Sequence, residues 1–224
     1  MTEIGRIYTD IPDKFGVPRQ AGLVPDLTGK IIFHPPYNTP QAFVGIEAFS
    51  HIWIIWQFDE NIREEFSPTV RPPRLNGNKR MGVFATRSSF RPNSIAISCV
   101  KLDRVEHTKS NGTVLYVSGI DMKNDTPILD IKPYITYTDS HPDAVFGFAQ
   151  DFVDYALEVD FPEKLIEKIP APKRAGIIGI LKQDPRPSYQ HDSERIYAVR
   201  YLNFDVKFKV NENMLTVVDI VTLN

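Results

Sequence analysis

Residues 71–93 read RPPRLNGNKRMGVFATRSSFRPN, and the rest of the chain is arranged around this stretch. It carries six Arg and Lys side chains and no acidic one. Its three prolines fix φ and remove backbone donors, so the stretch cannot form one long helix. The apolar run MGVFATR (81–87) lies between the two proline-bearing ends, and it predicts a short buried strand flanked by two stiff loops.

The arginines of this stretch suit the binding of planar anions. A guanidinium holds its donors in a fixed plane that matches carboxylate and phosphate groups. Solvated surface charge is the other explanation of a basic run. The prolines that stiffen this stretch favour anion binding, because charges that only face solvent do not need a rigid backbone. Both explanations stay open at this point.

Composition places the chain among ordinary globular proteins of one or two domains. It has 224 residues, 42% hydrophobic and 24% charged, with a formal net charge of −2. That charge argues against a protein that coats nucleic acid without specificity, but it allows local recognition of RNA. Cys99 is the only cysteine, which fits a reducing compartment. With no signal peptide and no apolar run near about 20 residues, we expect a cytoplasmic protein without a membrane segment.

The first 145 residues predict a β-barrel. Short strands with proline-marked corners and few helical periods indicate a closed or strongly curved sheet. We expect EIGRIY (3–8) to be an edge strand and HIWIIWQF (51–58) to be covered on both faces. Further strands are expected through residues 31–33 of LTGKIIFHPPY and in residues 94–105, 113–121 and 126–135. Alternation in the strand at 94–105 puts Ile95, Ile97 and Cys99 on one face.

Residues 146–224 predict a small α+β domain. The segments 162–170 and 172–183 place apolar residues at helical spacing, with proline near the first turn. Residues 203–210 and 213–223 alternate as two strands of a hairpin joined at Asn211–Asn213. The first of these strands points four apolar side chains inward: Phe204, Val206, Phe208 and Val210.

Common catalytic signatures are missing from the sequence. It has no GxGxxG after a strand, no GxxxxGK[ST] and no GxSxG, so neither a Rossmann nor a P-loop nor a hydrolase site is predicted. The histidines lie far apart, and we expect no metal site. We interpret Cys99 as a small buried hydrophobe and His51 as a structural histidine. An enzyme of this sequence therefore uses an uncommon scaffold.

Several long segments, in order, resemble one family, the TsaA-like (YaeB/TrmO-type) tRNA (adenine(37)-N6)-methyltransferases. In the first domain they are VPRQAGLV, GIEAFSHIWIIWQF, PTVRPPRLNGN, GVFATRSSFRPN and TPILDIKPYI. In the second domain they are LKQDPRPSY and FDVKFKV, so the resemblance spans nearly the whole chain.

The resemblance implies a β-barrel methyltransferase without a Rossmann domain. It implies S-adenosylmethionine as methyl donor and N6-threonylcarbamoyladenosine at position 37 of tRNA as substrate, in a homodimer. Asp59 stands where the family often has histidine. By resemblance, the cofactor site falls on Pro18, Arg19, Gln20, Phe58, Asp59, Arg87, Ile97, Ser118, Gly119, Ile120 and Asp121.

The chemistry of the cofactor suggests roles for some of these residues. Arg87 or Arg19 supplies a cation for its carboxylate, and Asp121 accepts from its ribose hydroxyls. Phe58 and Ile97 form apolar walls for adenine, although core packing explains these two side chains equally well.

Catalytic candidates lie in ILDIKPY. Asp130, Lys132 and Tyr134 alternate there, so a regular strand turns them to one side. The urea-like N6 is a poor nucleophile while protonated, and Asp130 is a candidate base. Lys132 or Arg91 is a candidate partner of the threonyl carboxylate. A structural ion pair is the alternative explanation.

For the anticodon loop of tRNA, we expect phosphate contacts from the basic stretch and a further contact from the second domain. A base in that loop is already unpaired, so it can enter a pocket at low cost. Tyr189 is a candidate stacking residue. The predicted substrate-binding residues are Arg71, Arg74, Arg91, Asn93 and Arg186, and Lys79 and Arg80 also suit phosphate.

Two other readings remain open. The chain would be a β-barrel that binds RNA without catalysis, or a methyltransferase of the same scaffold with a different substrate. A binding module gives no reason for the VPRQ and SGID segments, which the cofactor reading uses.

Overall fold

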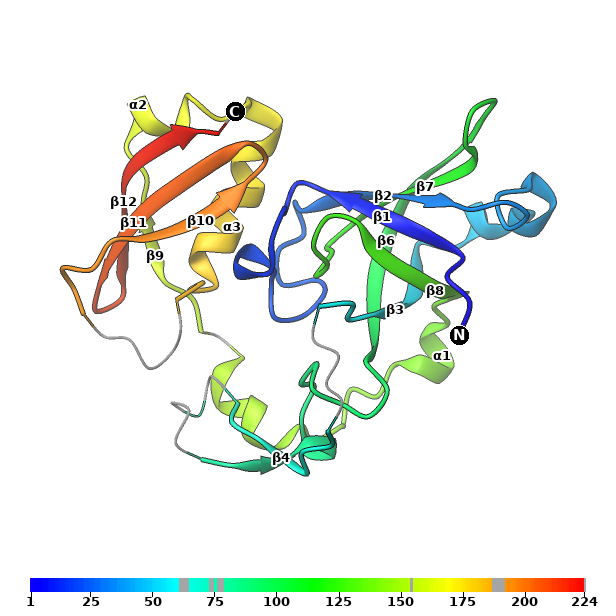
Figure 1. The fold of residues 1–224 in the computed structure, drawn as a ribbon, viewed down its shortest axis with the longest axis horizontal. Helices are drawn as coiled ribbons and strands as arrows, with labels where there is room; N and C mark the ends of the chain where they lie inside the picture. The colour runs from blue at the N-terminus through cyan, green and yellow to red at the C-terminus, as the bar shows by residue number, and fades with distance from the viewer. Residues whose placement is uncertain (61–64, 73–74, 76–78, 154, 187–191, 224) are drawn as a thin grey trace.

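A computed structural model describes residues 1–60, 65–72, 75, 79–153, 155–186 and 192–223. A β-barrel and a smaller sheet lie next to each other, and a third group of short elements containing β4 lies below them (Figure 1). Within the described ranges, no helix is both long enough and apolar enough to cross a membrane.

Six of the described strands close into an antiparallel barrel, which confirms the predicted fold class. Strand β1 pairs with β2 on one side and with β8 on the other, so EIGRIY is not an edge strand and that prediction is wrong. Closure satisfies the backbone groups that an edge would leave unpaired. Around the barrel the order is β1 (Gly5–Thr9), β2 (Thr28–Phe33), β7 (Gly112–Ser118), β6 (Ile95–Thr108), β3 (His51–Gln57) and β8 (Thr126–Pro133).

Strand β3 has one buried face rather than two. Ile52 and Ile54 are fully buried, whereas Trp53 and Ile55 between them are half-buried. The prediction of cover on both faces is wrong, because each strand of a closed barrel has one interior and one outer face. Strand β6 alternates as predicted, but Cys99 faces outward and is half-buried, not buried.

The MGVFATR run is not a buried strand. Strand β5 (Met81–Gly82) pairs with β4 (Thr69–Val70) over two residues, and the turn η5 (Val83–Ala85) follows. Val83 is buried, but Phe84 is 72% exposed. With one buried side chain, the run lacks the apolar face that would hold a longer strand against a core. Arg74, a predicted substrate residue, and Tyr189 lie outside the described residues.

The C-terminal part forms a four-stranded sheet with helices. Its hairpin is as predicted, with Phe204, Val206, Phe208 and Val210 all buried. The segment 162–170 forms only one α-helical turn, so the longer helix predicted there is wrong. The order of the sheet is β10 (Tyr197–Tyr201), β11 (Phe204–Asn211), β12 (Met214–Thr222) and β9 (Glu158–Asp160), and its helices are α2 (Glu163–Ile166) and α3 (Arg174–Lys182).

Short helical elements fill the connections. The 3-10 turns are η1 (Lys14–Gly16), η2 (Pro40–Phe43), η3 (Ile46–Ala48), η6 (Gly147–Phe152) and η7 (Ala171–Lys173), and the single-turn α-helix is α1 (Thr136–Asp139).

Two glycines let α3 approach the barrel segment closely. A Cβ at Gly179 would lie 2.3 Å from Cγ1 of Val24, and one at Gly176 would lie 3.2 Å from Cδ2 of Leu27. Val24 and Leu27 belong to the long connection between β1 and β2, which reaches α3 in Figure 1. An ion pair between Lys173 and Asp10 closes the same junction.

We expect Gly179→Leu to lower the free energy of unfolding by about 1–3 kcal/mol, because the larger side chain overpacks against Val24. Urea unfolding measures this loss. Ala175→Leu is the matched control on an exposed position of α3, with an expected change within about 0.5 kcal/mol. Equal effects of the two substitutions would contradict the tight contact.

Candidate active site

A cavity of about 810 Å³ lies at the side of the barrel. Its lining comes from five segments that are far apart in the sequence, which the barrel brings together: residues 14–20, 55–60, 86–91, 95–97 and 121–126. The cavity is therefore a product of the closed sheet and not of one continuous motif.

Most of the predicted cofactor residues line this cavity. They are Pro18, Arg19, Gln20, Phe58, Asp59, Arg87, Ile97 and Asp121, and the predicted substrate residue Arg91 joins them.

Ser118, Gly119 and Ile120 are not among the lining residues. Ile120 is 1% exposed, within the core. Gly119 has φ +73°, and its carbonyl accepts from the Gly22 amide at 2.8 Å. Ser118 donates to Asp103 at 3.1 Å. These three residues hold the turn that leads into Asp121.

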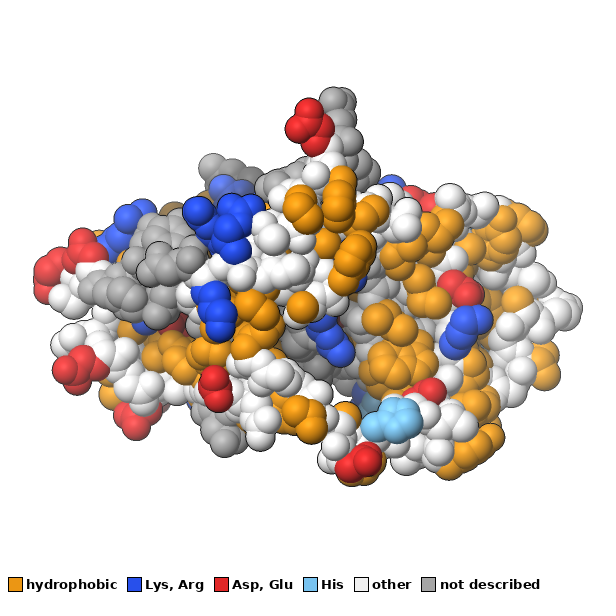
Figure 2. All heavy atoms as spheres, turned by 90° about the horizontal axis from the view of Figure 1, so that it is seen from below, with side chains coloured by type: hydrophobic (Ala, Val, Ile, Leu, Met, Phe, Trp, Pro, Cys, Tyr) orange, Lys and Arg blue, Asp and Glu red, His pale blue; other side chains and the backbone are white. Residues whose placement is uncertain are grey.

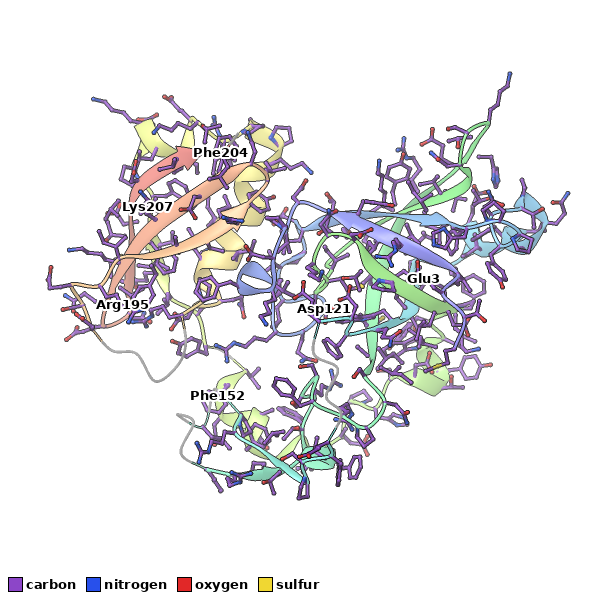
Figure 3. All side chains as sticks on the ribbon, in the orientation of Figure 1. Glu3, Asp121, Phe152, Arg195, Phe204 and Lys207 are labelled. Carbon is purple, nitrogen blue, oxygen red and sulfur yellow. The ribbon has the colours of Figure 1, made fainter. Side chains whose placement is uncertain are left out.

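Asp121 ends a hydrogen-bond chain that starts in the barrel interior. The Trp56 indole Nε1 donates to Ser98 Oγ at 2.9 Å, and that hydroxyl donates to Asp121 Oδ1 at 2.6 Å. Burial raises the pKa of the Asp121 carboxyl, although Ser98, two backbone amides and the Arg87 charge act in the opposite direction. Figure 3 shows Asp121 near the middle of the molecule. The cavity therefore has a rigid, partly desolvated acceptor.

Arg87 lies on the cationic side of the cavity. Its guanidinium donates to the Gln20 side-chain carbonyl, and the Gln20 amide donates to the Arg19 carbonyl. Arg91 donates to the carbonyls of Val83 at 3.2 Å and Thr86 at 2.8 Å, so it holds the loop that carries Arg87. The two predicted cofactor segments, 18–20 and 87, are thus joined directly.

A second charged cluster, which the sequence reasoning missed, borders the cavity. Lys123 Nζ lies 2.9 Å from Glu60 Oε1 and 3.8 Å from Asp59 Oδ2. The hydrogen bond from Lys123 lowers the pKa of Glu60. The predicted cofactor residue Asp59 thus lies beside a cation of this chain. Only the proximity of the two segments in space reveals the pair.

Aromatic and aliphatic side chains form the remaining wall. The Trp56 and Phe58 rings lie 4.5 Å apart at 60°. Ile97 is 55% exposed although it is apolar, and it lines the cavity together with Ile55. Trp56, Thr86, Ser88 and Ser89 were not singled out from the sequence. For Thr86, Ser88 and Ser89, the available signal in the sequence was their position next to Arg87 in the polar run TRSS (86–89).

Comparison with known proteins identifies the family. Residues 6–140 match the model of the tRNA-methyltransferase O N-terminal domain, and residues 154–223 match that of the TrmO C-terminal domain. The chain belongs to the tRNA-methyltransferase O family. This confirms the family resemblance and the predicted enzyme class, a tRNA methyltransferase.

Two bacterial relatives are similar to this chain over most of their length. A protein of Escherichia coli (strain K12) named tRNA (adenine(37)-N6)-methyltransferase is 41% identical over 94% of this chain and 92% of its own. One from Pseudomonas aeruginosa, described as an S-adenosylmethionine-dependent methyltransferase, is 37% identical over 92% and 90%. A crystal structure of TrmO from Pseudomonas aeruginosa matches with TM-score 0.77 and 31% identity, covering 99% and 100%.

The predicted catalytic residues of this chain, Asp130, Lys132 and Tyr134, lie one strand away from the cavity. Asp130 pairs with Ile55 and Ile55 pairs with Ile97, so the three form a row across β8, β3 and β6. Lys132 Nζ lies 3.3 Å from Asp130 Oδ2, which is the ion pair that the sequence left open. The Tyr134 ring packs 5.7 Å from that of Trp53. None of these three residues lines the cavity itself.

The other predicted substrate residues are spread out. Arg71 and Asn93 are exposed. The Arg186 side chain is 10% exposed and donates to both Asp184 oxygens, at 2.8 and 2.9 Å. Tyr155 donates to the same carboxylate at 2.7 Å. Although burial opposes it, these partners lower the pKa of Asp184. The Arg186 guanidinium is thus engaged within its own domain.

We expect Asp121→Asn to stabilise the fold near neutral pH while it weakens cofactor binding. Folding raises the pKa of Asp121, so at a pH above the raised pKa the charged carboxylate lowers the stability of the fold. At a pH below the ordinary carboxyl pKa the group is protonated in both the folded and the unfolded chain, and this cost is absent. The gain in unfolding midpoint should be present at about pH 8 and lost at about pH 4. Thermal unfolding across pH measures it. Cofactor affinity should fall about tenfold or more.

Asp143→Asn, at an exposed carboxylate, is the control and should show neither effect. Unchanged cofactor affinity of Asp121→Asn would contradict the role of Asp121 as acceptor.

Proposed function

We propose that this chain transfers the methyl group of S-adenosylmethionine to N6 of N6-threonylcarbamoyladenosine at position 37 of tRNA. Membership of the tRNA-methyltransferase O family and the printed name of the Escherichia coli relative support the tRNA adenine class. The observation that carries the proposal is the cavity, which joins an arginine, a buried carboxylate and an aromatic wall.

The residues of the cavity fit this cofactor by their chemistry. Arg87 or Arg19 meets its carboxylate, Asp121 accepts from its ribose hydroxyls, and Phe58 and Ile97 flank its adenine. Ser118, Gly119 and Ile120 support this set by fixing the turn before Asp121. When bound, S-adenosylmethionine supplies an electrophilic methyl group on a sulfonium.

The protein contributes alignment and handling of a proton. The N6 nitrogen is urea-like, so removal of its proton makes it a better nucleophile. Asp130 lies in the same row as the cavity residues Ile55 and Ile97, from which position it accepts that proton. The threonyl carboxylate binds to Lys132, which forms an ion pair with Asp130, or to Arg91. Tyr134 borders the substrate on the same side as Lys132. Holding nitrogen and methyl carbon in line accounts for most of the acceleration.

The RNA side uses charge and an unpaired base. Arg71, Arg74 and Asn93 belong to the basic stretch of residues 71–93 and contact the anticodon loop, whose target base enters the cavity at low cost. Arg186, engaged with Asp184, supports the second domain's contact with the RNA. We place the boundary between the two domains at residues 145 and 146. We also propose that the enzyme works as a homodimer in the cytoplasm and needs no metal.

Purified protein with labelled S-adenosylmethionine should label tRNA that carries the threonylcarbamoyl group and not tRNA that lacks it. Arg87→Gln should weaken cofactor binding about ten- to hundredfold, since it removes a charge-assisted hydrogen bond. Isothermal titration measures the affinity, and scintillation counting measures the transfer. For cofactor affinity, Arg80→Gln is the control, because Arg80 donates to Thr69 outside the cavity, at 2.7 Å.

Equal labelling of both tRNA pools would point to a different substrate, and an absence of binding heat would point to an RNA-binding module without catalysis.

Exposed apolar side chains support the homodimer. Tyr137, Val145 and Val153 are 88%, 86% and 60% exposed. Burying such side chains between two copies removes them from water. We expect a dimeric mass by sedimentation and a shift to monomer in Val145→Asp. A monomeric wild type at micromolar concentration would contradict this part of the proposal.

A further inference from the structure

Two phenylalanine side chains lie exposed beside the cavity and stack on each other. Phe66 is 57% exposed and Phe84 is 72% exposed. Their ring centroids lie 6.3 Å apart, with an interplanar angle of 25°. The barrel core does not account for them, because neither ring is buried in it.

This aromatic pair is held rigidly. Thr69 pairs with Gly82 in the short β4–β5 ladder, and the Val83 amide donates to the Pro68 carbonyl at 3.0 Å. Val83, directly before Phe84, is 1% exposed and anchors the turn. The Arg91 guanidinium lies 5.7 Å from the Phe84 ring centre. A face fixed in this way loses little conformational entropy when a flat partner binds.

The surroundings of the pair are cationic. The exposed Glu65 stands directly before Phe66, but no acidic residue follows from Phe66 to Leu102 in the sequence. Exposed cations on the same stretch are Arg71, Lys79, Arg80 and Arg87. Figure 2, viewed from the side on which β4 lies, shows hydrophobic side chains flanked by Lys and Arg side chains. A partner with flat apolar faces and negative charge fits this surface, and single-stranded RNA has both.

The pair also lies close to the cavity along the chain and in space. Phe84 precedes the lining residue Thr86 by two positions, and Arg91 both contacts the Phe84 ring and lines the cavity. A base stacked on Phe84 therefore belongs to a nucleotide near the one that enters the cavity.

From these observations we infer that Phe66 and Phe84 form a stacking platform for an unpaired base of the tRNA that neighbours the target adenosine. The inference rests on the proposed tRNA substrate and adds two residues that are not among the predicted site residues and do not line the cavity. The other occupant of an exposed aromatic surface, a second copy of this chain, is an outcome of the test below.

We expect Phe84→Leu to weaken the binding of threonylcarbamoylated tRNA about tenfold, the loss typical of one base–aromatic stack. Leucine keeps the apolar volume and removes the π face. Phe84→Trp should bind tRNA at least as tightly as wild type, because indole stacks well. Fluorescence anisotropy with labelled tRNA, in the absence of cofactor, measures the affinity. Phe66→Leu should give a smaller loss in the same direction.

Tyr37→Leu is the matched control. Tyr37 is 39% exposed in the connection after β2, which lies away from β4 in Figure 1, and its replacement should leave tRNA affinity within about twofold of wild type. Affinity for S-adenosylmethionine, measured by titration calorimetry, should stay unchanged in all four variants.

Two results would overturn the platform. One is tRNA affinity of Phe84→Leu equal to that of the Tyr37→Leu control. The other is a fall in the sedimentation mass of Phe84→Leu, which would assign the surface to a second copy of the chain. Loss of tRNA affinity in Phe84→Leu without any methyl transfer by wild type would keep the platform and reject the proposed reaction, so the two failures are separable.

Discussion

Closure of the barrel between β1 and β8 is the constraint on which the site depends. A Cβ at Gly5 would lie 2.5 Å from the Ile32 carbonyl oxygen, so the absence of a side chain there lets β1 fit between its two neighbours. Once the sheet is closed, each strand has one interior face, and outward side chains fall into rows across strands. The row Ile97, Ile55 and Asp130 is one result, and it links the cavity to the catalytic candidates.

The interior and the cavity are coupled by polar groups as well as by packing. Trp56 belongs to the core, yet its indole nitrogen orients Ser98, and Ser98 orients the Asp121 carboxylate. Burial of this carboxylate lowers the stability of the fold. A hydrogen-bond acceptor that is fixed and shielded from water binds hydroxyl groups more strongly than a mobile acceptor in water. The raised pKa of Asp121 therefore reflects the burial of its carboxylate, which the hydrogen bond from Ser98 offsets only in part.

The second domain packs against the cavity-lining segment from Lys14 to Gln20. A Cβ at Gly16 would lie 3.0 Å from Val199 on β10, and Gly179 of α3 packs against Val24. The segment from Lys14 to Gln20 thus lies between the cavity and the C-terminal sheet, with a smaller cavity of about 280 Å³ on its other side, next to Arg186. Asp184, held by Arg186 and Tyr155, orders the chain at that point. Both domains therefore determine where Arg19 and Gln20 lie.

The sequence alone determined the class of fold and the family, and it predicted several of the segments that line the cavity. These predictions rest on patterns among neighbouring residues, which can be read from the sequence directly. The patterns are the short strands marked by prolines, the alternation from Phe204 to Val210, and the long motifs around Arg19, Arg87 and Asp130. Tertiary structure alone decided which residues meet. It paired Lys123 with Glu60, joined Arg87 to Gln20, turned Cys99 outward and left Phe84 exposed where MGVFATR predicted a buried strand. The reason is physical: the period of a strand says that neighbouring side chains alternate, but only closure and register decide which face is interior and which distant segments become neighbours.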